Sequence, residues 1–371
     1  MAFRIVFDAY HLYHLPQFDP VIDLLIKDER FEIFLTTSSE TLPDEQNLTK
    51  RILQSRNVPC IFSDNEEDRA ARIRALNPAV FICGWSRYPL EKYVTEKTLV
   101  GMIYHGIGVK PSYWKDNHPR VDVRFVEGPF RMRQLREKGI TTDLELTGFT
   151  KIDPLFNGQI PDRNTILSGL GLDPDKKTLL YGPTFYPSSF EYFGLKLPEM
   201  TKDINLIIKL HQWSYLMEKY SGVNLRHHVK LTAKIHKKYP QVAIIEPEHY
   251  NIIDLYQAAD VLLTEASSTI YEFMALRRPV IVCDFYKRKL GHRLLPSHIY
   301  KHRLDQNMST NMTNFCYHIK KPKDLSEVLD TSLNKPDPFT EIREKYISDM
   351  LYQLDGKASE RIRGSLINKL N

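Results

Sequence analysis

The residues best suited to chemistry lie where apolar segments end in histidine, lysine or hydroxyl side chains. In "MIYHGIGVKPSYW", His105 and Gly106 follow the apolar segment Leu99–Tyr104, and Lys110 comes shortly after. Glycine permits a tight turn and a close approach of another molecule to the backbone. Histidine ionises near neutral pH, so His105 is a candidate general base. The motif alone leaves open a loop histidine that only hydrogen-bonds to the backbone.

Two later segments place polar residues where a phosphate would bind. In "LLYGPTFYPSSF", Thr184 follows Gly182 and Pro183, at a point where a Rossmann half often holds a phosphate, although the segment is not a P-loop. In "LIIKLHQWS", Lys209 and His211 end an apolar run. Burying both groups unpaired is costly, so we expect them to face either a polar cleft or solvent.

The stretch "VLLTEASSTIYEF" joins an apolar run to a segment with helical spacing. Ser267, Ser268 and Thr269 open the helical part, as ordinary N-caps or as a cradle for an anion. Glu265 precedes them and would repel a phosphate placed directly on it. We therefore expect Glu265 to accept hydrogen bonds from hydroxyls beside the phosphate, on a ribose or a glycerol.

Two other motifs are weaker. "ELTGFTKIDPLF" ends an apolar run and continues with Lys151 and Asp153, a pattern typical of an exit turn and also a candidate substrate contact. His11 and His14 are spaced i,i+3, but the Pro16 that follows favours a loop, and the pattern is not a convincing set of metal ligands. We predict no metal site and no cofactor.

The elements that must position these residues alternate between short apolar runs and helix-length amphipathic segments. Such alternation predicts parallel sheets covered on both faces. The Pro-, Gly- and Asp-rich segment 158–177 predicts a linker with one short helix. We expect a Rossmann-like domain over 1–157, the linker 158–177, a second Rossmann-like domain over 178–336 and terminal helices over 337–371. The expected strands are Arg4–Ala9, Phe31–Thr36, Val58–Phe62, Ala79–Gly84, Leu99–His105, Arg124–Val126, Leu144–Thr147, Thr178–Gly182, Asn205–Leu210, Val242–Ile245, Val261–Thr264 and Val280–Cys283.

Composition supports an ordinary globular protein of two domains. The chain has 371 residues, 42% of them hydrophobic and 26% charged, enough for two cores. No apolar run approaches the roughly 18–20 residues of a membrane-spanning helix, and the N-terminal residues lack the features of a signal peptide. The four cysteines lie far apart, which favours reduced thiols in the cytoplasm. A net charge of +5 is too mild for a dedicated nucleic-acid binder.

One segment, "LRHHVKLTAKIHKKYP", concentrates basic residues. It is interpreted either as the solvated face of a surface helix or as a surface attracted to an anionic membrane or polymer.

Taken together, these motifs resemble the CDP-glycerol glycerophosphotransferase family of teichoic-acid and capsule synthesis. The resemblance covers residues from about 99 to 285 and rests on motifs that occur in the same order. These are His105-Gly106 with Lys110, Gly148 with Lys151 and Asp153, Tyr181–Thr184, Lys209-Leu210-His211, the Glu265–Ser268 helix entry and the apolar Arg277–Phe285 segment.

The resemblance implies a GT-B-like α/β fold, with two Rossmann-like domains facing a cleft. It implies that His105 acts as base on the acceptor hydroxyl, that His211 contacts the donor phosphates, and that Ser267 and Ser268 bind phosphate. The implied reaction is transfer of glycerol phosphate from CDP-glycerol to a glycan or undecaprenyl-linked acceptor, with release of CMP. A cytoplasmic location, with peripheral attachment to the inner face of the membrane, fits this role.

The chain departs from the family pattern at three points. Glu265-Ala266 stands in place of Asp-Tyr, Lys151 in place of arginine, and Gly108 in place of proline. These departures leave ribitol or another polyol open as the cargo. Alternatives are a GT-B glycosyltransferase or epimerase acting on a nucleotide sugar, and a nucleotide-binding module without turnover.

Overall fold

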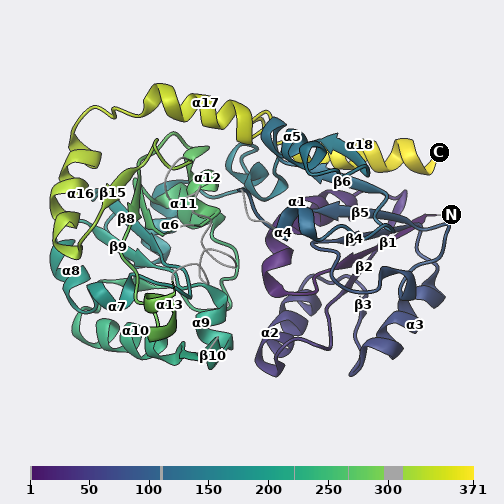
Figure 1. The fold of residues 1–371 in the computed structure, drawn as a ribbon, viewed down its shortest axis with the longest axis horizontal. Coiled ribbons are helices and arrows are strands. Elements are labelled where there is room, and N and C mark those ends of the chain that lie inside the picture. The colour runs from purple at the N-terminus through teal and green to yellow at the C-terminus, as the bar shows by residue number, and fades with distance from the viewer. Residues whose placement is uncertain (1, 109–111, 221, 266, 296–311) are drawn as a thin grey trace. The chain divides into compact units, whose positions relative to one another are not determined.

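The computed structural model describes residues 2–108, 112–220, 222–265, 267–295 and 312–371 (Figure 1). These residues form two compact units. Unit 1 comprises the described residues of 1–107, 111–157 and 348–371, and unit 2 those of 108–110 and 158–347. Each unit is a layered α/β structure built on a parallel sheet, as the alternation of apolar runs predicts.

Within its described residues, unit 1 has a seven-stranded sheet in the order β3-β2-β1-β4-β5-β6-β7. Every neighbouring pair is parallel. The chain order reverses between β1 and β4, and the carboxyl ends of strands at such a reversal are where α/β sheets bind ligands. The strands are β1 (Phe3–Asp8), β2 (Phe31–Thr36), β3 (Cys60–Ile61), β4 (Val80–Cys83), β5 (Leu99–Ile103), β6 (Val123–Val126) and β7 (Asp143–Leu146).

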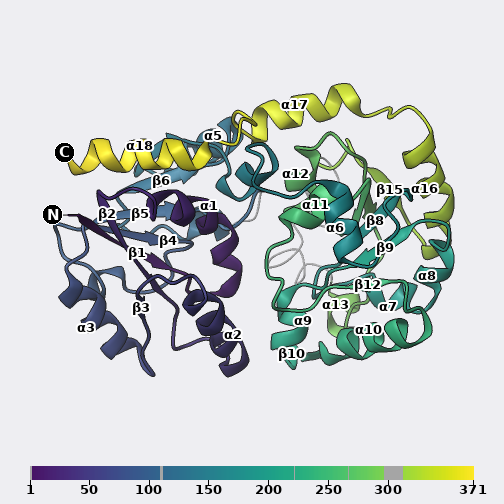
Figure 2. The same ribbon diagram turned by 180° about the vertical axis from the view of Figure 1, so that it is seen from behind.

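Helices cover both faces of the unit 1 sheet (Figure 1). On one face, α1 packs Phe18 against Phe7 of β1, with ring centroids 5.7 Å apart. The C-terminal helix α18 packs along α1 (Figure 2). The opposite face buries side chains of α3 and α5, such as Ile73 and Leu135. The helical elements are η1 (Leu12–His14), α1 (Leu15–Leu25), α2 (Pro43–Gln54), α3 (Glu66–Leu76), η2 (Leu90–Lys92), α4 (Ser112–Lys115), α5 (Pro129–Glu137), η3 (Thr150–Leu155) and α18 (Ala358–Leu370).

Unit 2 repeats the same plan. Among its described residues, the main sheet has the order β12-β9-β8-β13-β14-β15, again all parallel, and the reversal lies between β8 and β13. At that point Thr264 pairs with Gly182, and its Oγ1 donates to the Gly182 carbonyl at 2.8 Å. The strands are β8 (Thr178–Gly182), β9 (Asn205–Ile208), β12 (Ala243–Ile244), β13 (Val261–Thr264), β14 (Val280–Cys283) and β15 (Tyr317–Ile319), and a small hairpin pairs β10 (Lys219–Tyr220) with β11 (Val223–Asn224).

The core of unit 2 lies between this sheet and its helices. One face of the sheet packs against Phe190 of α7, Ile235 of α10 and Leu325 of α16. None of the helices in the described part of the chain is both long and apolar enough to cross a bilayer. The helical elements are α6 (Arg163–Gly169), α7 (Phe190–Phe193), α8 (Lys196–Met200), α9 (Gln212–Leu216), α10 (Arg226–Lys238), α11 (Ile253–Ala258), α12 (Thr269–Met274), α13 (Leu290–Leu294), η4 (Pro322–Asp324), α16 (Leu325–Asn334) and α17 (Thr340–Met350), the last of which crosses into unit 1.

The predicted α/β fold with two parallel sheets is confirmed, and the expected strands are found with shifts of one or two residues at their ends. The short helix expected in the linker segment 158–177 is α6, where the Asp162 side chain caps the helix by accepting from the Thr165 N–H at 3.0 Å. The whole segment belongs to unit 2 and does not stand apart from it. The expected terminal helices are α17 and α18, and α18 belongs to unit 1.

Candidate active site

His105 lies just beyond the carboxyl end of β5, near the point where the unit 1 sheet reverses. Its Nδ1 is 3.1 Å from the carbonyl oxygen of Gly84, which follows β4. A carbonyl oxygen can only accept, so Nδ1 carries the proton in this hydrogen bond. In the neutral ring the lone pair is then on Nε2. The geometry therefore gives His105 the tautomer that a general base needs at Nε2.

Three aromatic rings from the described part of the chain lie beside the His105 imidazole. The ring centroids of Tyr13, His14 and Tyr113 lie 5.2, 5.1 and 5.7 Å from that of His105. Tyr13 and His14 come from the η1 turn that follows β1. The sequence motif around His105 gives no sign of these neighbours, because they are about ninety residues earlier in the chain.

The η1 turn carries His11 and His14. The segment forms a short 3-10 turn, and a carboxylate does lie beside it in space. Glu45 of α2 places Oε1 2.9 Å from His11 Nδ1 and accepts from the Leu12 N–H at 3.1 Å. Sequence proximity could not reveal this carboxylate, because Glu45 is 34 residues from His11. Within the described residues, no group of three His, Cys, Asp or Glu side chains gathers as metal ligands would.

The other predicted residues of the His105 motif are only partly described. Gly106 is buried directly after His105. Lys110 lies outside the described residues. Lys151, from the later glycine motif, is half-buried in η3 of unit 1.

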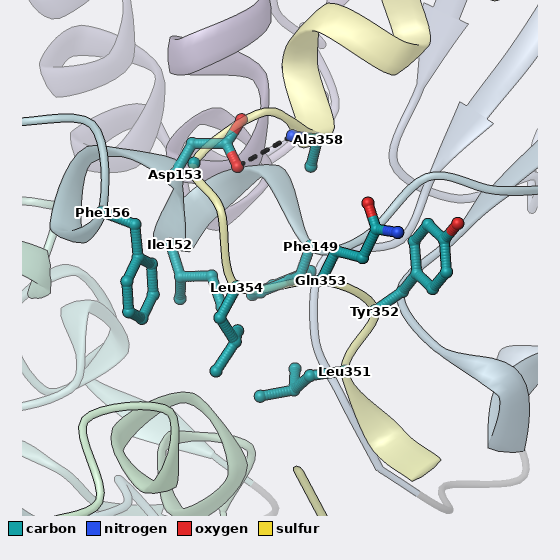
Figure 3. Close-up of a pocket in the computed structure, with 10 residues that line it drawn as sticks. Phe149, Ile152, Asp153, Phe156, Leu351, Tyr352, Gln353, Leu354 and Ala358 are labelled. Carbon is teal, nitrogen blue, oxygen red and sulfur yellow. Dashed lines mark hydrogen bonds between the residues drawn. The ribbon is translucent and has the colours of Figure 1, made fainter. Parts of the chain in front are cut away.

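Asp153 does not face an open site, contrary to its predicted role as a substrate contact. Its buried carboxylate accepts from the Ala358 N–H at 3.0 Å and from the Ser359 N–H at 2.7 Å (Figure 3). The Ser359 hydroxyl adds a bond of 2.6 Å. Burial raises the pKa of Asp153, and these hydrogen bonds oppose that shift. The carboxylate thus holds the N-terminal end of α18 against η3, beside a shallow hollow in unit 1 that is too small for a ligand.

In unit 2, His211 is the N-cap residue of α9 and lies just beyond the end of β9. Its Nδ1 accepts from the Trp213 N–H at 3.1 Å, as an N-cap. Because Nδ1 accepts, the proton of the neutral ring is on Nε2, the opposite tautomer to that of His105. The ring packs against Phe185, with centroids 4.7 Å apart. His211 therefore has a donor N–H at Nε2, which suits a phosphate oxygen.

Lys209 ends the same strand region and is buried, with an exposed fraction of 7%. Its Nζ donates to the His249 carbonyl oxygen at 2.6 Å. Of the two predicted environments for Lys209, a polar cleft or open solvent, the structure excludes open solvent, because the side chain is held inside unit 2.

The environment of Glu265 differs from the one predicted, in which its carboxylate accepts hydrogen bonds from hydroxyls of a ligand. The side chain is wholly buried, and its carboxylate binds the segment that follows β8. Oε2 accepts from the Thr184 N–H at 2.6 Å, and Oε1 accepts from the Ser189 N–H at 2.8 Å and from the Ser189 hydroxyl. Tyr181 completes the contacts with a phenol 3.5 Å from Oε1. Glu265 thus fixes the turn 184–189, and it is not exposed to accept from a ligand's hydroxyls.

The hydroxyl residues beyond β13 lie across the sheet reversal from Thr184. Ser267, Ser268 and Thr269 are all half-buried. The Ser267 hydroxyl accepts from the Thr269 N–H at a long 3.4 Å, and Thr269 Oγ1 is 3.4 Å from Thr264 Oγ1. Ser268 occupies the N-cap position of α12 without a side-chain capping bond within the described chain. The ordinary N-cap role therefore does not account for Ser268.

The curated proteins that the chain resembles are enzymes of teichoic acid synthesis. The chain is 26% identical over 173 residues to the teichoic acid poly(glycerol phosphate) polymerase of Bacillus spizizenii, covering 40% of this chain and 42% of that protein. It is 25% identical over 219 residues to the teichoic acid glycerol-phosphate transferase of Staphylococcus aureus, covering 58% and 52%. The chain thus spans about half the length of these relatives.

Comparisons with solved structures concern the fold alone, because identities are low. The wall teichoic acid polymerase TagF matches with a TM-score of 0.66 at 15% identity, covering 99% of this chain and 88% of that chain. A UDP-N-acetylglucosamine 2-epimerase matches with a TM-score of 0.61 at 14% identity, covering 99% and 96%.

The family model for CDP-glycerol:poly(glycerophosphate) glycerophosphotransferases matches residues 131–368, which is more than half of the chain. That span includes His211, Glu265 and the hydroxyl residues beyond β13, and it begins after His105. The chain belongs to the CDP-glycerol:poly(glycerophosphate) glycerophosphotransferase family.

Proposed function

We propose that this protein transfers glycerol phosphate from CDP-glycerol to a hydroxyl of a glycan or undecaprenyl-linked acceptor and releases CMP. Membership of the family and the named activities of its teichoic acid relatives support the donor and the reaction. The observation that carries the proposal is the pair of opposite imidazole tautomers, at His105 and His211. One ring is set to take a proton and the other to donate a hydrogen bond.

His105 is the proposed base in this reaction. Its Nε2 takes the proton from the acceptor hydroxyl as the oxygen attacks the β-phosphorus of CDP-glycerol. The new phosphorus–oxygen bond joins glycerol phosphate to the acceptor. The bond between the β-phosphorus and the bridging oxygen breaks, and its electron pair leaves with CMP. A positioned base of this kind contributes about 10²–10⁴-fold to a rate.

The donor phosphates are assigned to unit 2. The Nε2–H of His211 donates to a phosphate oxygen, and Lys209 places a cation at the same end of the sheet. Fixed donors and charges of this kind stabilise the charge that develops on the transferring and leaving groups. Ser267, Ser268 and Thr269 supply hydroxyls on the other side of the sheet reversal.

The remaining predicted residues have supporting roles in this proposal. Glu265 acts on the donor site indirectly, because it holds Thr184 in place through the backbone. Gly106 allows the acceptor to approach the backbone beside His105. Lys110 and Lys151 are retained as candidate phosphate or acceptor contacts.

A cytoplasmic location at the inner face of the membrane is part of the proposal. The helix α10 supports it, because its outward face is basic and its inward face buries His228, Thr232 and Ile235. An anionic lipid surface attracts such a face. The exposed basic residues of α10 are Arg226, Lys230, Lys234, Lys237 and Lys238.

The test offers the purified protein CDP-glycerol, CDP-ribitol and several UDP-sugars, each with candidate glycan and lipid-linked acceptors, and measures the nucleotide released. We expect CMP release that depends on an acceptor and is fastest with CDP-glycerol. Faster release from CDP-ribitol would change the cargo and leave the chemistry intact. Turnover of a UDP-sugar, without CMP release from either CDP-polyol, would refute the proposal.

A further inference from the structure

The η1 turn places a second histidine directly against the proposed base. The His14 side chain has an exposed fraction of 0%, and its ring plane is tilted 36° from that of His105. The rings of Tyr13, Trp85 and His11 enclose it at centroid distances of 4.7, 5.2 and 5.8 Å. The buried ring of His14 thus packs directly against the ring of His105.

Gly84 connects the two histidines. Its carbonyl oxygen accepts from His105 Nδ1, and its Cα lies under the ring of His14. A Cβ added at position 84 would lie 2.7 Å from Cγ, 2.9 Å from Nδ1 and 3.0 Å from Cδ2 of His14. Real Cβ atoms are essentially never as close as the first two of these distances. The position of the His14 ring and the position of the carbonyl that orients His105 are therefore coupled.

The turn that carries His14 is itself fixed. Glu45 is buried in α2 and binds both the His11 ring and the Leu12 backbone. This anchor precedes His14 by two residues, and the helix α1 begins directly after it. His14 is thus held from both sides along the chain.

His14 acts on His105 through packing, with its ring uncharged. Burial holds the pKa of His14 well below its usual value, and the neighbouring His105, His11 and Arg87 lower it further. Glu45 is the acidic group beside this turn, and it pairs with His11. Neither ring nitrogen of His14 has a hydrogen-bond partner within the described residues, so packing alone defines its place.

We propose that His14 is a positioning residue for His105. Its ring, seated on Gly84, holds the His105 imidazole in the orientation in which Nδ1 donates to the Gly84 carbonyl and Nε2 faces the acceptor. The role of Nε2 rests on the proposed function. The orientation of the ring can be tested without turnover.

The test uses the full-length protein labelled with ¹⁵N-histidine, and the His105 signals are assigned by their loss in His105→Gln. In the wild type we expect the Nδ1–H tautomer at His105. In His14→Ala we expect a mixture of tautomers. The kcat for transfer should fall by about tenfold or more, because a small misplacement of a catalytic group costs rate, while KM for CDP-glycerol stays within about twofold.

Gly84→Ala provides an independent variant of the same contact. Alone, it should reproduce both changes, because the added methyl collides with the His14 ring. In the His14→Ala background it should change kcat by less than about twofold, because the missing ring leaves room for the methyl group, and coupled residues do not add. Additive effects of the two substitutions would refute the coupling.

The control is Ile73→Ala, which opens a cavity in another part of the unit 1 core. It should lower the Tm without changing the His105 tautomer. Should His14→Ala fail to fold, His14→Leu refills most of the volume without a planar ring and should show the same change in tautomer. An unchanged tautomer in the folded His14 variants would overturn the inference. A wild type that transfers nothing, yet shows the predicted change, would refute the proposed function and support this inference.

Discussion

Replacing Glu265 with alanine should loosen the turn 184–189 and weaken donor binding together. The substitution leaves the Thr184 and Ser189 N–H groups without their acceptor. A buried donor left unsatisfied costs about 1–3 kcal/mol, so the two together cost about 2–6 kcal/mol, with Thr184 at the low end because it is partly exposed. This is a large share of a total stability of about 5–15 kcal/mol. Ser189→Ala keeps both backbone bonds and should cost only about 1 kcal/mol.

The pH dependence of this stability has a defined sign. Burial raises the pKa of Glu265 in the folded protein above its ordinary value of 4.5. The folded state therefore holds the proton more tightly than the unfolded state, and the stability from this group is lost as the pH rises from 4.5 through the raised pKa. Glu265→Gln cannot titrate. The stability of the wild type relative to Glu265→Gln should be greater at pH 5 than at pH 8.

The assay is urea unfolding of the wild type, Glu265→Ala, Glu265→Gln and Ser189→Ala at both pH values, with calorimetric titration of CDP-glycerol at pH 7.5. We expect the order wild type, Ser189→Ala, Glu265→Gln, Glu265→Ala in decreasing stability, and donor affinity in the same order. A Glu265→Ala protein with the urea midpoint and donor affinity of the wild type would refute the structural role given to this carboxylate.

Three further predictions test other parts of the account. His211→Ala should weaken CDP-glycerol binding by about tenfold or more, since a hydrogen bond to a charged group is worth about 1.5–3 kcal/mol, and calorimetry that shows unchanged affinity would remove His211 from the donor site. Asp153→Ala should lower the unfolding free energy by about 1–2 kcal/mol, as the loss of a helix cap does, while kcat stays within about twofold. A loss of kcat without a loss of stability would instead show that Asp153 contacts the substrate. Changing Lys234, Lys237 and Lys238 together to Glu should reduce co-sedimentation with anionic liposomes and leave co-sedimentation with neutral liposomes unchanged. Equal binding of the wild type and the variant to anionic liposomes would show that α10 is an ordinary solvated helix.

The sheets were predictable because their strands are continuous apolar runs. Buried parallel strands such as Val80–Cys83 and Val280–Cys283 bury both faces, so no alternation obscures them. The strand Tyr317–Ile319 was missed, because it has only three residues and is only half-buried at its first two positions. The helix α1 contains Pro20 in its interior, where a proline usually ends or kinks a helix. There the local proline signal is outweighed by burial of Phe18, Val21 and Ile22 in the core.

The site was predictable only at the level of which strand ends carry chemistry. The motifs place Thr184 and Glu265 each just after a predicted strand, but the order of those strands in the sheet comes from the structure. Their hydrogen bond joins residues 81 apart, which no local pattern encodes. The same holds for Asp153, whose partner Ala358 is 205 residues away. The tautomer of His105 was equally out of reach, because it depends on the Gly84 carbonyl, 21 residues away. The tautomer of His211 instead depends on the N–H of Trp213, two residues along the chain.

The strength of the sequence signal also differed between the two histidines of unit 1. His105 stood out because glycines flank it, whereas His14 sits among aromatic residues that resemble ordinary core. The role of His14 is indicated only by its contact with Gly84, and the sequence shows Gly84 merely as a glycine that ends an apolar run. A positioning residue that acts through packing leaves no pattern of its own in a single sequence.

The most direct test of the central claim is a single-turnover measurement on His105→Ala, with CDP-glycerol and an acceptor that the wild type uses. The account predicts that the rate of CMP release falls at least about 10²-fold, as removal of a general base requires, while the dissociation constant of CDP-glycerol stays within about twofold of the wild-type value. CMP release at the wild-type rate, or a loss of rate explained wholly by lost donor binding, would contradict it.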